Sequence, residues 1–126
     1  YKDMATFSKL AFQATTMTTG TGLGVKVVAT ATAGTTIHTA ANVATTVDEV
    51  WLYAVNTSAS DVKLTIEWGG VASPDDHIEY TVKAENGLYL IVPGLLIKGN
   101  ATALVVRAFA ATTNVICISG YVNVIA

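Results

Sequence analysis

The sequence predicts an all-β protein: an antiparallel β-sandwich, eight-stranded and jelly-roll-like, with an N-terminal arm. Two observations carry this prediction. From residue 24 onward, runs rich in Val, Ile, Thr and aromatic residues alternate with clusters of Gly, Pro, Asn, Asp and Ser, as strands alternate with turns. Many short strands with short connections are typical of β-sandwiches. We therefore divide the chain into an arm over residues 1–23 and one sandwich domain over residues 24–126.

The arm differs in composition from the rest of the chain. Met4, Phe7 and Leu10 recur at three-residue steps and would share one face of a helix. Phe12 falls off that face, and the threonine-rich run over residues 15–21 weakens a helix further. An extended arm that docks on a neighbouring subunit fits the same residues, so both conformations stay open.

Eight runs in the domain carry the strand signature. Residues 62–68 and 77–83 alternate between apolar and polar side chains, which is typical of strands with one buried and one solvated face. The run 48–56 is apolar on both faces, because its aromatic residues Trp51 and Tyr53 alternate with aliphatic ones. A second apolar face in a sandwich needs cover. The eight predicted strands span residues 25–32, 36–40, 48–56, 62–68, 77–83, 88–97, 103–109 and 115–125.

Clusters of turn-forming residues separate these runs. Asn86-Gly87 favours a hairpin turn with positive backbone angles. Pro74-Asp75-Asp76 fits a type I turn. Calcium binding by the two aspartates is the alternative, although such a site needs about six oxygen ligands or more.

The amino-acid composition indicates which class of molecule the protein binds. Hydrophobic residues make up 52% of the chain and charged residues 13%, against about 25% charged in an average soluble domain. The longest apolar run, residues 88–97, contains Pro93 and Gly94 and is only half as long as the roughly 20 residues of a membrane-spanning helix. No export signal is visible. The net charge of -2 and seven scattered basic residues offer no stripe for nucleic acid, so we expect protein partners and neither membrane nor nucleic acid.

No arrangement of residues predicts catalysis, a metal site or a cofactor. The glycine-rich loop 20–24 leads into a strand, whereas a phosphate-binding loop lies between a strand and a helix. His38, His77 and Cys117 are too few and too scattered for zinc. Cys117 lies in an apolar run, which favours a buried structural thiol. There is no Gly-x-Ser-x-Gly nucleophile elbow, so we expect no enzyme and no cofactor.

Two further sets of residues keep alternatives open. Four glutamates offer carboxylate pairs for glycoside hydrolysis, but each also fits as a solvated strand or turn residue. They are Glu49, Glu67, Glu79 and Glu85. Five aromatic residues are candidates for a sugar-stacking platform, namely Trp51, Tyr53, Trp68, Tyr80 and Tyr89. Trp68 lies on the apolar side of its strand, which favours the core, and Trp51 and Tyr53 share a face with Val55, which favours a subunit contact.

Four segments resemble small virion proteins of tailed bacteriophages. They are TTIHTA at residues 35–40, DEVWLYAVN at 48–56, LTIEWGG at 64–70 and VVRAFA at 105–110, and the similarity covers most of residues 24–125. The resemblance implies a β-sandwich subunit, commonly trimeric, that decorates or cements a capsid and binds the major capsid protein or another virion protein. It also implies a place in the virion, after synthesis in the cytoplasm of the bacterial host. A tail or fibre component and a glycan-binding module are the alternatives.

The resulting hypothesis is a capsid decoration protein that assembles with copies of itself. Apolar residues of the arm and of the doubly apolar strands are the predicted subunit or capsid contacts. They are Phe7, Leu10, Phe12, Trp51, Tyr53 and Phe109.

Overall fold

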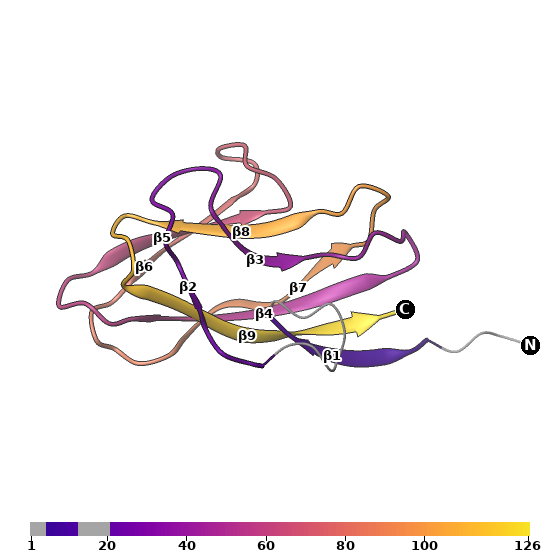
Figure 1. Cartoon of the computed structure of the whole chain (residues 1–126), viewed down its shortest axis with the longest axis horizontal. Coiled ribbons are helices and arrows are strands. Elements are labelled where there is room, and N and C mark those ends of the chain that lie inside the picture. The colour runs from indigo at the N-terminus through magenta and orange to yellow at the C-terminus, as the bar shows by residue number, and fades with distance from the viewer. Residues whose placement is uncertain (1–4, 13–20) are drawn as a thin grey trace, which may run out of the picture.

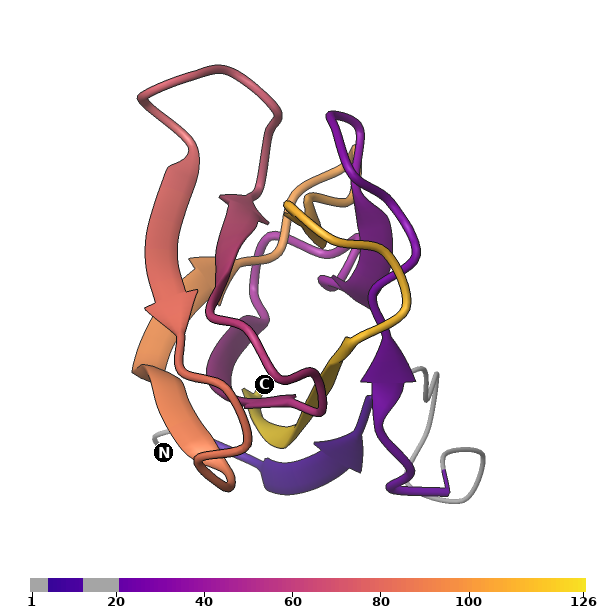
Figure 2. The same cartoon turned by 90° about the vertical axis from the view of Figure 1, so that its left-hand side faces the viewer.

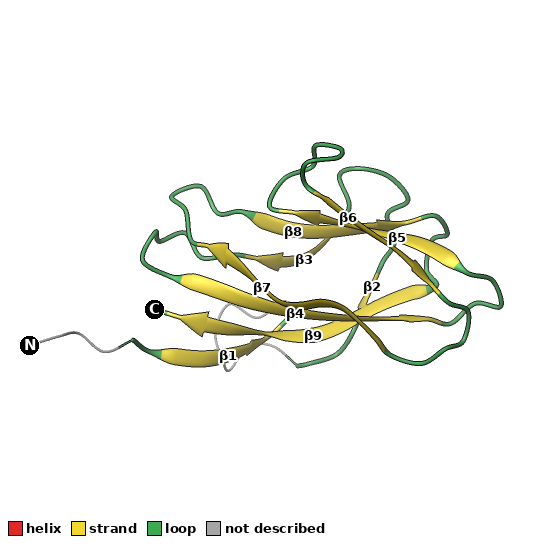
Figure 3. Ribbon diagram, turned by 180° about the vertical axis from the view of Figure 1, so that it is seen from behind, coloured by secondary structure: helices red, strands yellow, loops and turns green. Residues whose placement is uncertain are grey.

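The described part of the chain consists of strands and loops (Figure 3). The computed structural model describes residues 5–12 and 21–126, and within these ranges the chain has nine strands and no helix. The strands are β1 Phe7–Ala11, β2 Val25–Lys26, β3 Thr35–Thr39, β4 Val47–Asn56, β5 Val62–Trp68, β6 His77–Val82, β7 Tyr89–Lys98, β8 Val105–Ala110 and β9 Ile116–Ile125. The all-β prediction is confirmed.

Two antiparallel sheets face each other. Sheet A has the order β1-β9-β4-β7, with the short β2 also pairing with β9, and sheet B has the order β3-β8-β5-β6. In Figure 1, β1, β9 and β4 form the lower layer and β3 and β8 the upper one. Figure 2 looks along the longest axis and shows the layers enclosing an interior. The prediction of an antiparallel β-sandwich is confirmed.

The strand pairs are nested along the sequence. β1 pairs with β9, β3 with β8, β4 with β7 and β5 with β6, all antiparallel. These are the pairs that would form if the chain were folded into one long hairpin with its turn between β5 and β6. Two further pairs, β4 with β9 and β5 with β8, connect these strand pairs side by side into two sheets. Many neighbours in the sheets are therefore far apart in the sequence. The jelly-roll assignment itself stays a prediction.

The core lies between the sheets and follows from the period-two alternation of the strands. In β4, Val50, Leu52 and Ala54 are fully buried, whereas Trp51 and Tyr53 point to the opposite side of the sheet and are half-buried. The facing residues of sheet B include Leu64, Ile66, Val106 and Ala108. Each fully buried Val, Leu or Ile side chain stabilises the fold by about 1.5–3 kcal/mol relative to an exposed one. This burial decides which face of each strand points inward.

The predicted strand over residues 25–32 is wrong beyond its second residue, because the chain changes sheets there. Val27 N donates to Ile116 O of sheet A at 2.8 Å, and Ala29 O accepts from Ala110 N of sheet B at 3.0 Å. One strand cannot serve both sheets, so β2 stops after two residues. The other seven predicted strands coincide with β3 to β9 to within two residues at each end.

Part of the predicted arm belongs to sheet A. Phe7–Ala11 forms β1, which pairs antiparallel with β9 of the same chain. For this segment the extended conformation is right, the helical one is wrong, and the docking partner is the chain itself rather than a neighbour. Phe12 follows β1 into the core. Met4 and residues 15–20 of the polar run lie outside the described residues.

Cys117 lies on the outer side of sheet A. Its neighbours in β9, Ile116 and Ile118, are buried between the sheets, whereas Cys117 is half-buried and points the other way. The prediction of a buried thiol is therefore wrong. The apolar run that contains Cys117 covers both faces of one strand, and only one of those faces is core.

Candidate interaction surface

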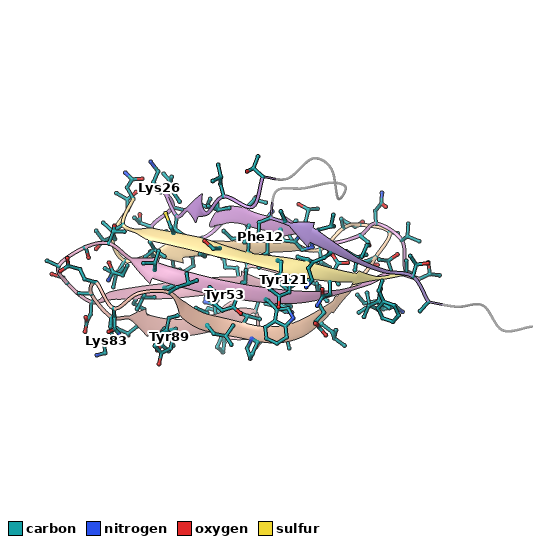
Figure 4. The ribbon with its side chains drawn as sticks, turned by 90° about the horizontal axis from the view of Figure 1, so that it is seen from below. Phe12, Lys26, Tyr53, Lys83, Tyr89 and Tyr121 are labelled. Atoms are coloured by element: carbon teal, nitrogen blue, oxygen red, sulfur yellow. The ribbon has the colours of Figure 1, made fainter. Side chains whose placement is uncertain are left out.

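The strand register gives the rows of side chains on the outer side of sheet A. From β7 across to β1, the first row is Lys98, Val47, Ile125 and Phe7, and the second is Leu96, Glu49, Asn123 and Lys9. The third row is Pro93, Trp51, Tyr121 and Ala11, and the fourth is Leu90, Tyr53 and Ser119. We call these residues outer face A. Figure 4 looks onto this side, with Tyr121 and Tyr53 within the sheet and Tyr89 at its β7 margin.

Trp51 occupies the centre of outer face A. Its ring stacks with that of Tyr121, with 6.0 Å between the centroids and 16° between the planes. The indole also lies against Gly94 of β7, where an added Cβ atom would come within 2.9 Å of the ring. Gly94 has a φ of +81°, which favours glycine. The Pro93-Gly94 pair thus shapes β7 so that Trp51 can lie half-buried beside it.

Glu49 is held on outer face A by neighbouring donors. Its Oε1 accepts hydrogen bonds from Trp51 Nε1 at 2.7 Å and from Asn123 Nδ2 at 2.8 Å. The bond from Trp51, followed by the bond from Asn123, lowers the pKa of the Glu49 carboxyl below its ordinary value. Lys9 lies over the Tyr121 ring, with Nζ 4.7 Å from the ring centroid. Because these polar groups already have partners, covering them costs less.

A hollow of about 310 Å³ opens beside Glu49 on the same face. Its lining residues are Phe7, Ser8, Lys9, Glu49, Asn123 and Ile125. Phe7 is 73% exposed at its margin. The hollow combines apolar walls with carboxylate, amide and ammonium groups, a mixture that suits a side chain of another protein or a sugar ring.

The β7 margin carries the densest group of exposed apolar side chains. We call this group the leucine rim, and it consists of Leu88, Tyr89, Leu90, Leu95 and Leu96. It holds five of the ten large hydrophobic residues that are exposed in the described part of the chain. The centroid of the Tyr89 ring lies 5.1 Å from that of Tyr80, and the neighbouring Tyr89 side chain raises the pKa of the Tyr80 hydroxyl. Exposed apolar groups gathered in this way mark interaction sites.

The outer side of sheet B is built differently. The loop 28–34 is bound to it through Glu67, whose carboxylate accepts from the Thr32 hydroxyl and from Gly34 N, the latter at 2.6 Å. Glu67 is fully buried, and His77 Nε2 lies 3.7 Å from its Oε2. The expectation that Glu67 is solvated is wrong, because the loop covers it.

The structure brings together three of the six predicted contact residues. Phe7, Trp51 and Tyr53 lie on outer face A, contributed by β1 and β4. They come from segments more than 40 positions apart in the sequence, and β9 between the two strands joins them into one surface.

The other three predicted contact residues lie elsewhere. Leu10 points inward from β1 and is partly buried against the core. Phe12 is 3% exposed, so the prediction that it contacts another subunit is wrong: it is core of its own chain. Phe109 is half-buried on the outer side of sheet B, edge-on to the His77 ring at 5.7 Å, and the structure does not join it to Trp51 and Tyr53.

A second cavity, of about 1000 Å³, opens at the side of the sandwich between β3 and the β1 and β2 margin. His38 of sheet B and Asp48 of sheet A both line it, and both are buried. His38 Nε2 lies 2.6 Å from Asp48 Oδ2, where the imidazole N–H donates and the carboxylate accepts. The pair ties the two sheets together. Sequence patterns did not single it out, because only the packing of one sheet on the other brings the two residues into contact.

The Pro74-Asp75-Asp76 segment forms a turn. Asp76 Oδ2 accepts from Ala72 N at 3.0 Å, and Asp76 N donates to Ala72 O at 2.9 Å. Within residues 5–12 and 21–126, no three His, Cys, Asp or Glu side chains are grouped so that they could hold a metal ion. None of the described residues forms a helix that could span a membrane.

The leucine rim and Tyr121 are the parts of this surface that the sequence-based hypothesis missed. A signal for the rim was available, because no residue from 88 to 97 is charged, whereas edge strands are usually protected by charged side chains. Tyr121 gave no such signal. Its place beside Trp51 depends on the register of β9 against β4.

Comparisons with known proteins found no similar protein. No protein-family model matches the sequence, and neither the curated proteins nor the solved structures gave a match.

Proposed function

We propose that this protein is a structural virion subunit of a tailed bacteriophage, a capsid decoration or cement protein that assembles with copies of itself and stabilises the head. One observation carries the proposal: outer face A and the leucine rim form a continuous, largely apolar surface at one side of the sandwich. The resemblance to small phage virion proteins supplies the phage context, the trimer and the major capsid protein as a further partner. The role is structural rather than catalytic.

The composition of this surface supports a lasting protein contact. Interfaces of permanent assemblies are more apolar than other protein surfaces, and aromatic residues are enriched in them. Trp51, Tyr53 and Phe7 supply such residues. Glu49 and Lys9 are already engaged by their neighbours. A capsid lattice would also bury surface that a chain with 13% charged residues leaves poorly protected in water.

We also propose that the sandwich is a jelly roll. The nested antiparallel pairs, from β1 with β9 inward to β5 with β6, support this assignment. A jelly roll is a double-sheet arrangement of eight strands in two Greek keys. Here β2, with two residues, is the additional strand.

The proposal is tested by the mass of the purified protein in solution, alone and after mixing with empty phage capsids that lack their decoration protein. Light scattering gives the oligomer, and co-sedimentation gives capsid binding. A stable homo-oligomer that co-sediments with capsids is the expected result. A stable oligomer that does not bind capsids would favour a tail or fibre component, and a monomer without capsid binding would overturn the proposal.

A glycan-binding module is the second candidate, and a specific observation favours it. The stacked rings of Trp51 and Tyr121 lie next to a hollow with carboxylate and amide groups from Glu49 and Asn123. Sugars bind to aromatic rings flanked by a few polar groups of this kind. A glycan array decides: binding that Trp51→Ala abolishes supports this function, and an array without hits removes it.

A further inference from the structure

The backbone of β7 limits what can cover the leucine rim. β7 is an edge strand of sheet A. A further strand cannot pair along its whole length, because Pro93 has no N–H and Gly94 departs from extended geometry. Register shifts against β4 occur at two places along the same strand. The occupant therefore contacts side chains and does not extend the sheet.

The two cavities described above do not reach the rim. Neither the hollow beside Glu49 nor the cavity beside His38 is lined by a residue of β7, and small-molecule sites are concave. No residue from 88 to 97 is charged, and the Tyr89 ring lies against that of Tyr80, with 5.1 Å between the centroids. The rim thus offers apolar area with little hydrogen bonding, so its occupant is a broad apolar protein surface.

The area of this side of the sandwich matches one stable protein contact. β4, β7 and β9 each have ten residues, which makes them about 34 Å long, and four neighbouring strands span about 19 Å. The face of sheet A is therefore roughly 650 Å², and the rim adds to it. A standard interface takes about 800 Å² from each partner.

We propose that a second copy of this chain covers the leucine rim, and that the rim anchors a subunit contact that extends onto the adjoining outer face A. The inference rests on the proposed function, because it names the partner of the same surface. Contacts between permanently associated copies are the most apolar class of interface, and the rim has no charge that would steer a foreign partner to it. In a symmetric homo-oligomer each copy carries the same apolar surface, so the rim of one copy can cover the rim of another.

The experiment compares two double variants with the wild-type protein. Leu88→Lys with Leu96→Lys places two charges on the rim, at leucines that are 59% and 57% exposed. The control, Leu23→Lys with Val28→Lys, adds the same charge at exposed residues that flank β2, across sheet A from β7. All three proteins are studied by analytical ultracentrifugation over a concentration series, with circular dichroism and thermal unfolding to show that each is folded.

We expect the rim variant to be a folded monomer, or to associate with a dissociation constant at least about 100-fold higher, because each contact loses buried leucine side chains. The control should keep the wild-type mass. A rim variant with the wild-type mass and affinity would overturn the inference and leave the proposed function intact. A wild-type protein that is monomeric but binds capsids would overturn the inference and the self-assembly part of the proposed function, and would leave its capsid-binding part intact. A monomer that binds no capsids would overturn both proposals.

Discussion

The two outer sides of the sandwich each carry a hydrogen-bonded glutamate, but they differ in what covers it. On sheet B, Glu67 is fully buried under the loop 28–34 and accepts hydrogen bonds from that loop. On sheet A, Glu49 is half-buried and is held by Trp51 and Asn123 of its own face. Sheet B is thus covered in part by its own chain, whereas outer face A keeps its apolar side chains open to a partner.

Because of this difference, we expect one side of the sandwich to contribute to the stability of the single chain and the other to its association. A side chain that the protein itself covers contributes to the folding of the single chain, and an apolar side chain left open contributes when another molecule covers it. The polar groups of sheet B beyond the loop fit this division, since Lys63 and Glu79 form an exposed ion pair at 3.0 Å. Substitutions on sheet B should therefore change unfolding, and substitutions on outer face A should change assembly.

The largest effect is expected at Phe12, which lies on the inner side of sheet A. Phe12→Ala should lower the free energy of unfolding by about 3–5 kcal/mol, because it opens a cavity in the core. Phe7→Ala, on outer face A, should change it by no more than about 0.5 kcal/mol and should weaken assembly instead. Urea unfolding and ultracentrifugation of both variants measure the two effects. Equal losses of stability would show that outer face A belongs to the core.

The next largest effect is expected at Glu67. Glu67→Ala leaves Gly34 N and the Thr32 hydroxyl without their acceptor, so the unfolding free energy should fall by about 3 kcal/mol. Glu67→Gln keeps an acceptor oxygen and the side-chain volume, and it should lose less. Hydrogen exchange should report faster opening of the loop 28–34 in the alanine variant. If the loop 28–34 exchanged its amide hydrogens as slowly in Glu67→Ala as in the wild type, Glu67 would not hold the loop on sheet B, and the proposed difference between the two outer sides would be wrong.

Strand alternation predicted most of the fold, because it is a local property. The runs 62–68 and 48–56 needed only the period of two to be recognised, and both strands end where the sequence predicts. The change of sheet after Val27 has no local signature in the sequence, because the residues on both sides of it are apolar and their hydrogen bonds nevertheless go to different sheets. The sequence therefore predicted one continuous strand where the chain passes from sheet A to sheet B.

The surface could be predicted only in part, because it depends on register and cover. The apolar outer side of β4 was visible in the alternation of Trp51 and Tyr53. Phe7 and Phe12 are an odd number of positions apart, so an extended strand places them on opposite sides. Only the packing of sheet A on sheet B decides that Phe12 is the buried one and Phe7 the exposed one. Glu67 was expected in solvent because the loop that covers it lies more than 30 positions away.

A smaller effect is expected at Glu49, and it depends on pH. The folded state lowers the pKa of Glu49 below the ordinary value of 4.5, so its stabilising share is fully present above that value and is lost as the pH falls through the lower, folded pKa. Glu49→Gln should therefore be less stable than the wild type at pH 6, and the gap should close as the pH falls below 4.5. Urea unfolding at pH 6, 4 and 3 measures it. A gap that does not change with pH would mean that the charge of Glu49 is not what Trp51 and Asn123 stabilise.

The smallest effect is expected at Lys9, the cation that lies on the Tyr121 ring of outer face A. Lys9→Met keeps the apolar stem and removes the charge, so the unfolding free energy should fall by only about 0.5 kcal/mol. Lys26→Met, an exposed residue of β2, is the control and should change stability less. Because the substitution makes outer face A more apolar, assembly should be as strong as in the wild type or stronger when measured by ultracentrifugation. If instead Lys9→Met separated the copies while Lys26→Met did not, the contact would depend on charge, and the contrast between an apolar sheet A and a polar sheet B would fail.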